Sequence, residues 1–171
     1  MHTTALAFAA TLAATLCVAA CDVSVREGEH GEHVDVRTPM ADISVSTEKA
    51  ADTGLPVYPG ARLQRNDDGR ENANVRVNVP FVDVQVAAAT FESSDAPGKI
   101  VAFYVKEMET YGKVTECRGE LDFQRSGPVC RGNNSGTIQL GVGAENDHRM
   151  VVVKPRAGAS EFAVVHVRTS A

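Results

Sequence analysis

Residues 94–112, SDAPGKIVAFYVKEMETYG, decide the fold, because no other stretch after the N-terminal segment has a clear helical pattern. Ile100, Tyr104, Met108 and Tyr111 recur at three- and four-residue spacing, so they would share one face of a helix. Lysine and glutamate side chains fall on the opposite face. Such a helix buries its apolar face against another element, and the rest of the chain offers strands. We therefore predict one helix packed on a sheet.

Both ends of this helix are marked in the sequence. Ser94 or Asp95 suits the N-cap position, where a side-chain oxygen accepts a hydrogen bond from a backbone N–H. Pro97 belongs in the first turn, where its missing N–H group costs nothing. Gly112 suits the left-handed position that ends a helix.

Strand patterns surround the helix on both sides. Valines alternate with polar residues over residues 75–79 and again over 82–86, after Pro80, which predicts a hairpin whose second strand runs on to Phe91. After Gly112 come five extended pieces separated by turn residues: KVTECR, ELDFQR, TIQLGVG, HRMVVVKP and EFAVVHVRT. Short turns favour an antiparallel meander. The predicted class is α+β, mostly antiparallel sheet covered on one face by the helix; the other face must be polar, wet or covered by a partner.

The composition fits one domain with a real core. The chain has 171 residues, of which 43% are hydrophobic and 23% charged, and it has no Trp. The net charge of −5 arises in one segment: residues 22–54 hold eight acids and three bases, whereas residues 55–171 hold fourteen of each. Nucleic-acid binding requires clustered Lys and Arg, so we expect no nucleic-acid partner.

The N-terminus has the pattern of an export signal. Residues 1–20 are an uncharged run of Ala, Leu and Thr that ends in small residues. Residues 18–21, VAAC, resemble the lipobox of bacterial lipoproteins, in which a diacylglyceryl group is attached to the cysteine and the preceding peptide is removed. The resemblance implies lipidation of Cys21 and a membrane anchor in the cell envelope. Ordinary cleavage after Ala20 and an uncleaved helical anchor are the alternatives.

Residues 21–54 form an acidic leader with short alternating pieces. The pieces HVDVRT and ADISVST resemble the repeated strands of bacterial adhesin-like β-domains. We favour a solvated tether that contains short strands and leads to a folded domain over residues 55–171. His30 and His33 lie among acids in this leader, and such side chains bind Zn or Cu. Because nothing fixes their geometry, we predict no specific metal site and keep both as weak candidates only.

The domain itself begins LPVYPGA at residue 55, continues with FYVKEM inside the predicted helix, and then carries a Tyr-Gly and a Cys-Arg pair. This order resembles a group of bacterial envelope lipoproteins that start their domain with YPGA and place an FY-bearing helix against a sheet. The similarity covers roughly residues 55–170. It implies no activity, cofactor or catalytic residue.

Four cysteines are present, and two of them fall in the N-terminal segment. Cys17 lies inside the signal and Cys21 is assigned to the lipid, which leaves Cys117 and Cys130. In an oxidising compartment these two most simply form a disulfide. Reduced thiols or a redox role are the alternatives, although the C-x-x-C redox motif is absent.

No catalytic constellation stands out. The chain has no G-x-S-x-G motif, and Ser160 is expected in a turn before the last strand. His166 reads as a solvated or hydrogen-bonded strand histidine, and His148 as a turn residue beside carboxylates. We expect a non-catalytic, lipid-anchored envelope protein without a cofactor, which binds an envelope protein or a small ligand or serves as a structural module. An envelope hydrolase and an adhesin-like β-module are the alternatives.

Overall fold

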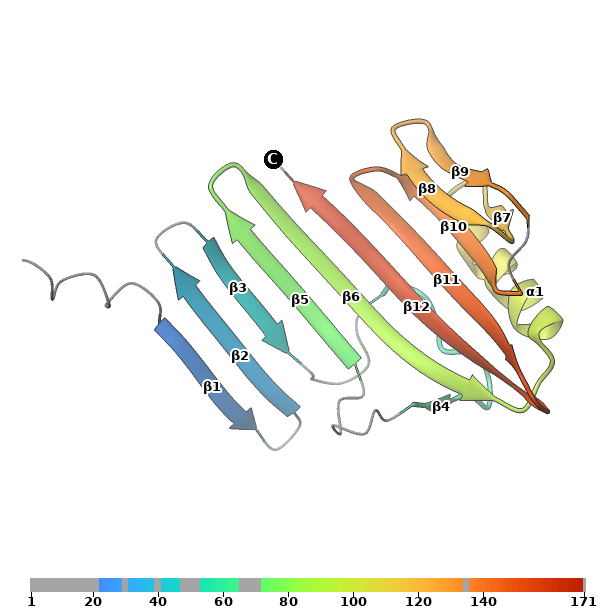
Figure 1. Ribbon diagram of the computed structural model, residues 1–171, viewed down its shortest axis with the longest axis horizontal. Helices are drawn as coiled ribbons and strands as arrows, with labels where there is room; N and C mark the ends of the chain where they lie inside the picture. Colours follow the sequence, from blue (N-terminus) through green and yellow to red (C-terminus); the bar gives the residue numbers. More distant parts are fainter. Residues whose placement is uncertain are drawn as a thin grey trace, which may run out of the picture.

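The structure is a computed structural model, and it describes residues 22–28, 31–38, 41–46, 53–64, 72–133 and 136–170. Most of these residues form one large antiparallel sheet with the order β1-β2-β3-β5-β6-β12-β11-β10-β7, and β4 pairs with β6 beside this path. Figure 1 shows the single helix at one end of the sheet. The predicted α+β class is confirmed. The strands are β1 (Asp22–Gly28), β2 (Gly31–Thr38), β3 (Ala41–Ser46), β4 (Arg62–Leu63), β5 (Asn72–Val79), β6 (Val82–Ser93), β7 (Thr115–Cys117), β8 (Glu120–Gln124), β9 (Gly127–Arg131), β10 (Ile138–Ala144), β11 (Asp147–Arg156) and β12 (Ala159–Ser170).

The helix α1 (Pro97–Met108) packs its predicted apolar stripe on β10 and β11. Ile100, Tyr104 and Met108 are fully buried there. The ring of Phe162 from β12 lies under the helix and stacks on Phe91 of β6 at a centroid distance of 5.4 Å. This core lies at the helix end of the sheet.

The predicted N-cap is wrong. Ala96 precedes the helix, and no side chain caps it. Asp95 is engaged elsewhere, because its carboxylate accepts a hydrogen bond from the Tyr58 hydroxyl at 2.9 Å and one from Lys99 at 2.6 Å. At the other end, α1 passes into the short 3₁₀ helix η1 (Glu109–Tyr111), and Gly112 follows with a φ of 134°.

The acidic leader is part of the sheet. Strands β1, β2 and β3 pair in order, and β3 pairs with β5 in a register that sets Ile43 opposite Val77. This finding corrects the expected solvated tether over residues 21–54: its short strands exist, but they extend the sheet of the domain across the expected boundary. The physical reason is the period-two pattern, since each leader strand continues the apolar face of its neighbour.

The C-terminal half follows the predicted meander in part. Strands β10, β11 and β12 pair antiparallel in chain order, and the hairpin of β5 and β6 is also confirmed. One strand was missed: β9, with the sequence GPVCR, has no apolar alternation to mark it. It pairs with β8 in a separate two-stranded sheet.

Candidate binding face of the sheet

Two rows of β-branched side chains cross the sheet on the side opposite the helix. The pairing registers align one row over five strands and the other over six. Two shorter rows flank them on β5, β6 and β12. We call these fifteen residues the valine face. Its members are Val23, Val36, Ile43, Val77 and Val84 in the first row; Val25, Val34, Val45, Val75, Val86 and Val167 in the second; and Val79, Val82, Ala88 and Val165 beside them.

The valine face is most exposed on β1, and its thirteen members on the other strands are partly buried. Val23 and Val25 on β1 are 61% and 57% exposed, which is high for valine in a sheet. Phe81, in the turn between β5 and β6, is 90% exposed and has a φ of 82°. A bulky residue at positive φ is uncommon and costs conformational energy. The described chain thus also carries an exposed aromatic ring in the turn that joins two strands of the valine face.

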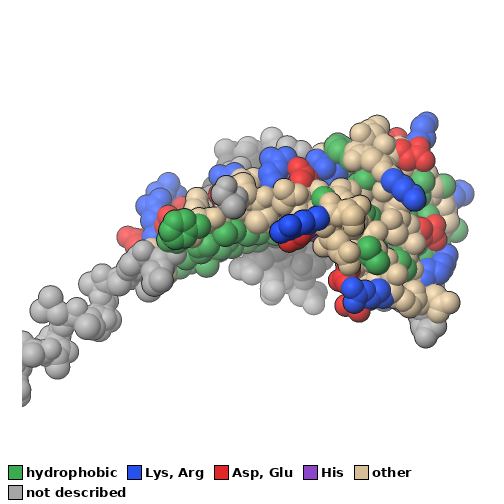
Figure 2. Space-filling model, turned by 90° about the horizontal axis from the view of Figure 1, so that it is seen from above, with side chains coloured by type: hydrophobic (Ala, Val, Ile, Leu, Met, Phe, Trp, Pro, Cys, Tyr) green, Lys and Arg blue, Asp and Glu red, His purple; other side chains and the backbone are tan. Residues whose placement is uncertain are grey.

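The same strands carry polar side chains on their other side. One row crosses seven strands in register and contains both charges and hydroxyl or amide groups. Figure 2 shows the two sides together: hydrophobic side chains line the lower side of the sheet toward β1, while Lys and Arg side chains gather on the upper side. The sheet is thus amphipathic, with a wet side and an apolar side. The polar row consists of Ser24, Asp35, Ser44, Arg76, Gln85, Arg168 and Asp147.

The hairpin of β8 and β9 closes the apolar side at the β10 end. Leu121 and Phe123 lie so close to Gly141 that a Cβ atom there would be 2.7 Å from Leu121 Cδ2 and 2.9 Å from Phe123 Cζ. Among the described elements, the helix and this hairpin are the ones that pack on the sheet from outside, and both do so over β10 and its neighbours. The valine face lies on the strands beyond this cover, from β12 across the sheet to β1.

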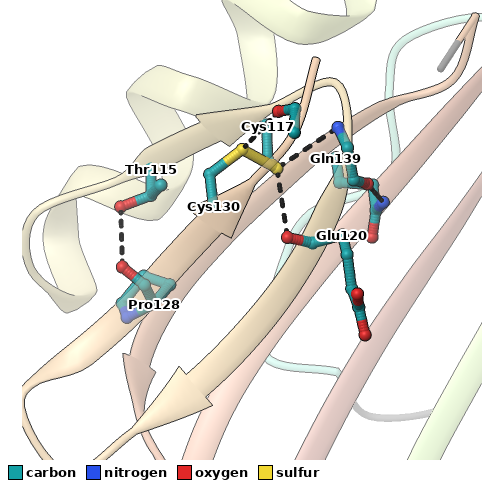
Figure 3. Close-up of a disulfide and its surroundings, with 8 residues drawn as sticks. Thr115, Cys117, Glu120, Pro128, Cys130 and Gln139 are labelled. Carbon is teal, nitrogen blue, oxygen red and sulfur yellow. Dashed lines mark hydrogen bonds between the residues drawn. A yellow bond between two sulfur atoms is a disulfide. The ribbon is translucent and has the colours of Figure 1, made fainter. Parts of the chain in front are cut away.

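A disulfide holds the hairpin against the sheet. Cys117 of β7 bonds to Cys130 of β9 with a Cα–Cα distance of 5.3 Å, so the predicted pairing is confirmed (Figure 3). Beside it, the Thr115 hydroxyl donates to the Pro128 carbonyl oxygen at 3.4 Å. Gln139 of β10 donates to the Gly119 carbonyl oxygen at 2.6 Å. The hairpin is therefore fixed covalently to one sheet edge.

His148 belongs to this cover, not to a turn. It lies in β11, and its ring stacks on Phe123 with a centroid distance of 3.9 Å and an interplanar angle of 17°. Burial lowers the pKa of His148 below its ordinary value. A histidine so placed is a neutral packing group at neutral pH.

His166 forms an ion-pair cluster on the helix side of the sheet. Its Nε2 lies 2.8 Å from Asp147 Oδ1, and both Arg149 and Arg168 approach the same carboxylate. Burial raises the pKa of Asp147, but the hydrogen bond with His166 and the nearby positive charges outweigh it, so the pKa lies below its ordinary value. The prediction of a hydrogen-bonded strand histidine is confirmed.

Ser160 and His166 do not come together in the structure. Ser160 lies in β12 and not in the predicted turn, and its hydroxyl donates to the Asp95 carbonyl oxygen at 2.7 Å. His166 is on the same strand, about 20 Å farther along at the usual rise per residue. These residues cannot form a nucleophile and base pair.

The remaining candidates fall outside what the structure describes. Cys21 and His30 are not among the described residues, and His33 is described in its backbone only. Within the described ranges, no three His, Cys, Asp or Glu side chains are grouped so that they could hold a metal ion. The helix of the described chain is too short to cross a membrane.

Comparisons with known proteins found no match, whether with models of protein families, with curated proteins or with solved structures.

Proposed function

We propose that this chain is a lipid-anchored protein of the bacterial cell envelope, without catalytic activity, which binds through the valine face. The observation that carries the proposal is the apolar side of the sheet, on which Val23 and Val25 are exposed and no described element packs between β1 and β12. Contiguous exposed apolar surface on a folded protein usually marks an interaction site, because water-exposed hydrocarbon is unfavourable.

The anchor part of the proposal rests on the sequence. Residues 18–21 carry the lipobox pattern, and Cys21 directly precedes Asp22, the first residue of β1. Two or three acyl chains on Cys21 would give stable membrane attachment, whereas one chain binds only marginally. With β1 in the sheet, the lipid would be joined to the sheet itself and not to a long tether.

One alternative gains support from the fold. The sheet is continuous from the leader strands into the domain, as an adhesin-like β-module requires. Such a module is also non-catalytic and also binds through its sheet, so it is a version of the same proposal. The hydrolase alternative has no assembled residues in its favour.

Membrane fractionation with a cysteine variant tests the anchor. The full chain expressed in its native host should sediment with the membranes, and intact mass should show a chain that begins at Cys21 with a diacylglyceryl addition. Cys21→Ala should move the protein to the soluble fraction. An unmodified wild-type chain in the cytosol would contradict the proposal.

A pair of neighbouring substitutions tests the binding face. Val84 points to the apolar side of β6 and Gln85 to the polar side, and both are half-buried. After crosslinking in intact cells, Val84→Lys should lose the crosslinked species that wild type forms, and Gln85→Lys should keep it. Equal behaviour of the two variants would show that binding does not use the valine face.

A further inference from the structure

We propose that the occupant of the valine face is a second copy of this chain, so that two sheets pack face to face about a two-fold axis. The inference rests on the proposed use of this face for binding but not on lipidation of Cys21. It makes the domain one half of a β-sandwich that two copies complete.

The chemistry of the face is self-complementary. All fifteen members are Val, Ile or Ala, and on β12 the first row continues with Thr169, which lies opposite Val84. Two apolar sheet faces pack about 10 Å apart, with the side chains of one interdigitating with those of the other. A face without charges meets its own copy without repulsion, and a two-fold interface always sets the same patch against itself.

The size of the face suits a dimer. The face lies on the six neighbouring strands β1, β2, β3, β5, β6 and β12, about 4.8 Å apart, and each of its fifteen members covers about 6.6 Å of its strand, so the face covers about 500 Å² on each copy. Two copies would then bury about 1,000 Å² in total, the size that a biological interface should reach. The same area left in water on a monomer is in the upper half of the range for the largest apolar patch of folded monomers.

The charges around the face disfavour a lipid leaflet. Anionic membrane surfaces attract Lys and Arg, each contributing about 1 kcal/mol near the surface. The arginines of the outer strands, Arg26, Arg37 and Arg76, alternate with the valines and therefore lie on the polar side. The two long rows of the valine face contain no Lys or Arg. An anionic leaflet lying against them would therefore find no cation to attract it.

The β8–β9 hairpin sets the register of the two copies. It stands on the apolar side over β10, so a second sheet can extend only as far as this hairpin, while β1 is the opposite edge of the sheet. A two-fold axis along the strands brings the β1 edge of each copy to the hairpin of the other. The disulfide between Cys117 and Cys130 holds that hairpin in place.

Site-specific photo-crosslinking of the full chain in intact cells tests the occupant. A benzophenone side chain is placed at residue 84, on the valine face, and in a matched variant at residue 85, on the polar side. The variant at 84 should give a species of twice the chain mass that contains this chain alone, and the variant at 85 should give at least tenfold less. A second pair, at Val25 and Arg26, repeats the test on β1, where both side chains are exposed.

Folding is checked in each variant by a cooperative urea transition with a midpoint close to that of wild type. If the folded variants at 84 and at 25 crosslink to a different protein, or only to lipid, the proposal of a second copy is wrong. The proposed use of the valine face for binding then still stands. Folded variants that give no crosslinked product at either position overturn both.

Discussion

At the scale of single residues, Gly141 fixes how the hairpin lies on the sheet. A Cβ atom there would lie 2.7 Å from Leu121 Cδ2 and 2.9 Å from Phe123 Cζ, so a methyl group would have to displace the ends of these two side chains. Glycine is used here for the close approach of two elements, not for a positive φ.

Gly141→Ala should destabilise the protein by about 1–3 kcal/mol, the usual cost of overpacking a filled contact. Urea unfolding of the purified chain measures this difference. Gly98→Ala is the matched control, because nothing lies within 4 Å of a Cβ atom there and alanine favours the helix. An unchanged midpoint for Gly141→Ala would show that the hairpin does not rest on β10.

Because of His148, the protein should be less stable at mildly acidic pH than at neutral pH. Burial lowers its pKa in the folded state, so the folded protein binds the proton less well than the unfolded chain, where the ordinary value is 6.5. The stability is fully present above that value and falls as the pH drops through the lower folded pKa. The lowered pKa of Asp147 acts in the same direction below about its ordinary value of 3.8.

The test compares urea midpoints at about pH 7.5 and about pH 5.5. His148→Phe keeps an aromatic ring stacked on Phe123 but cannot take up a proton, so its midpoint should fall less between the two conditions than that of wild type. An equal fall in both proteins would assign the acid sensitivity to other groups.

Some of these residue roles could be predicted from the sequence and others could not. The pairing of Cys117 with Cys130 followed because no other cysteine remained. Asp95 was expected to cap the helix, but its partner Tyr58 lies 37 residues away, and local pattern carries no information on that contact. His148 was misplaced for the same reason, since Phe123 meets it only after two hairpins have folded together.

At the scale of elements, periodicity was reliable where it was long. Ile100, Tyr104 and Met108 of the helix stripe and the alternating valines of β5 and β6 appear as predicted, but Tyr111, expected on the same stripe, lies in η1 and is 41% exposed. Strand β9 was missed because its five residues contain Gly and Pro, which weaken a strand pattern. Its place is fixed by the disulfide and by β8.

Removing the disulfide should loosen the β8–β9 element. The bond closes a loop with a sequence separation of 13 residues, and constraining the unfolded chain over such a loop contributes about 3 kcal/mol. The double variant Cys117→Ser and Cys130→Ser should lose about this much stability in thermal unfolding. Adding a reductant to wild type should give the same loss, and adding it to the double variant should change nothing.

At the scale of the whole molecule, the order of strands was beyond the sequence. Alternation shows which residues share a face, but it does not show which strand lies beside which. The leader strands and β5 each have apolar and polar sides, and only their pairing through β3 reveals one continuous valine face. The sequence therefore does not show that the leader strands and the strands of the domain form one surface.

If two copies share the valine face, unfolding must depend on protein concentration. Mass action then raises the melting temperature of wild type as its concentration increases. Val84→Lys places a charge in the interface and should abolish this dependence, while Gln85→Lys should retain it. Calorimetry at concentrations that differ about a hundredfold measures the effect, and a wild-type melting temperature that stays constant would argue for a monomer.

The central position of β12 constrains how the chain acquires its fold. This strand pairs with β6 on one side and β11 on the other, so among the described strands it alone joins the half of the large sheet that contains β1 to β6 with the half that contains β7, β10 and β11. It also comes after both halves in the order of synthesis. The two halves can therefore be joined only after β12 has been made, and the β6–β12 pairs lie from 67 positions apart at Ser93 and Ser160 to 87 at Asp83 and Ser170, which is the kind of topology that folds slowly. The centre of the large sheet is therefore among the last parts of it to form, although it is flanked on both sides by strands made earlier.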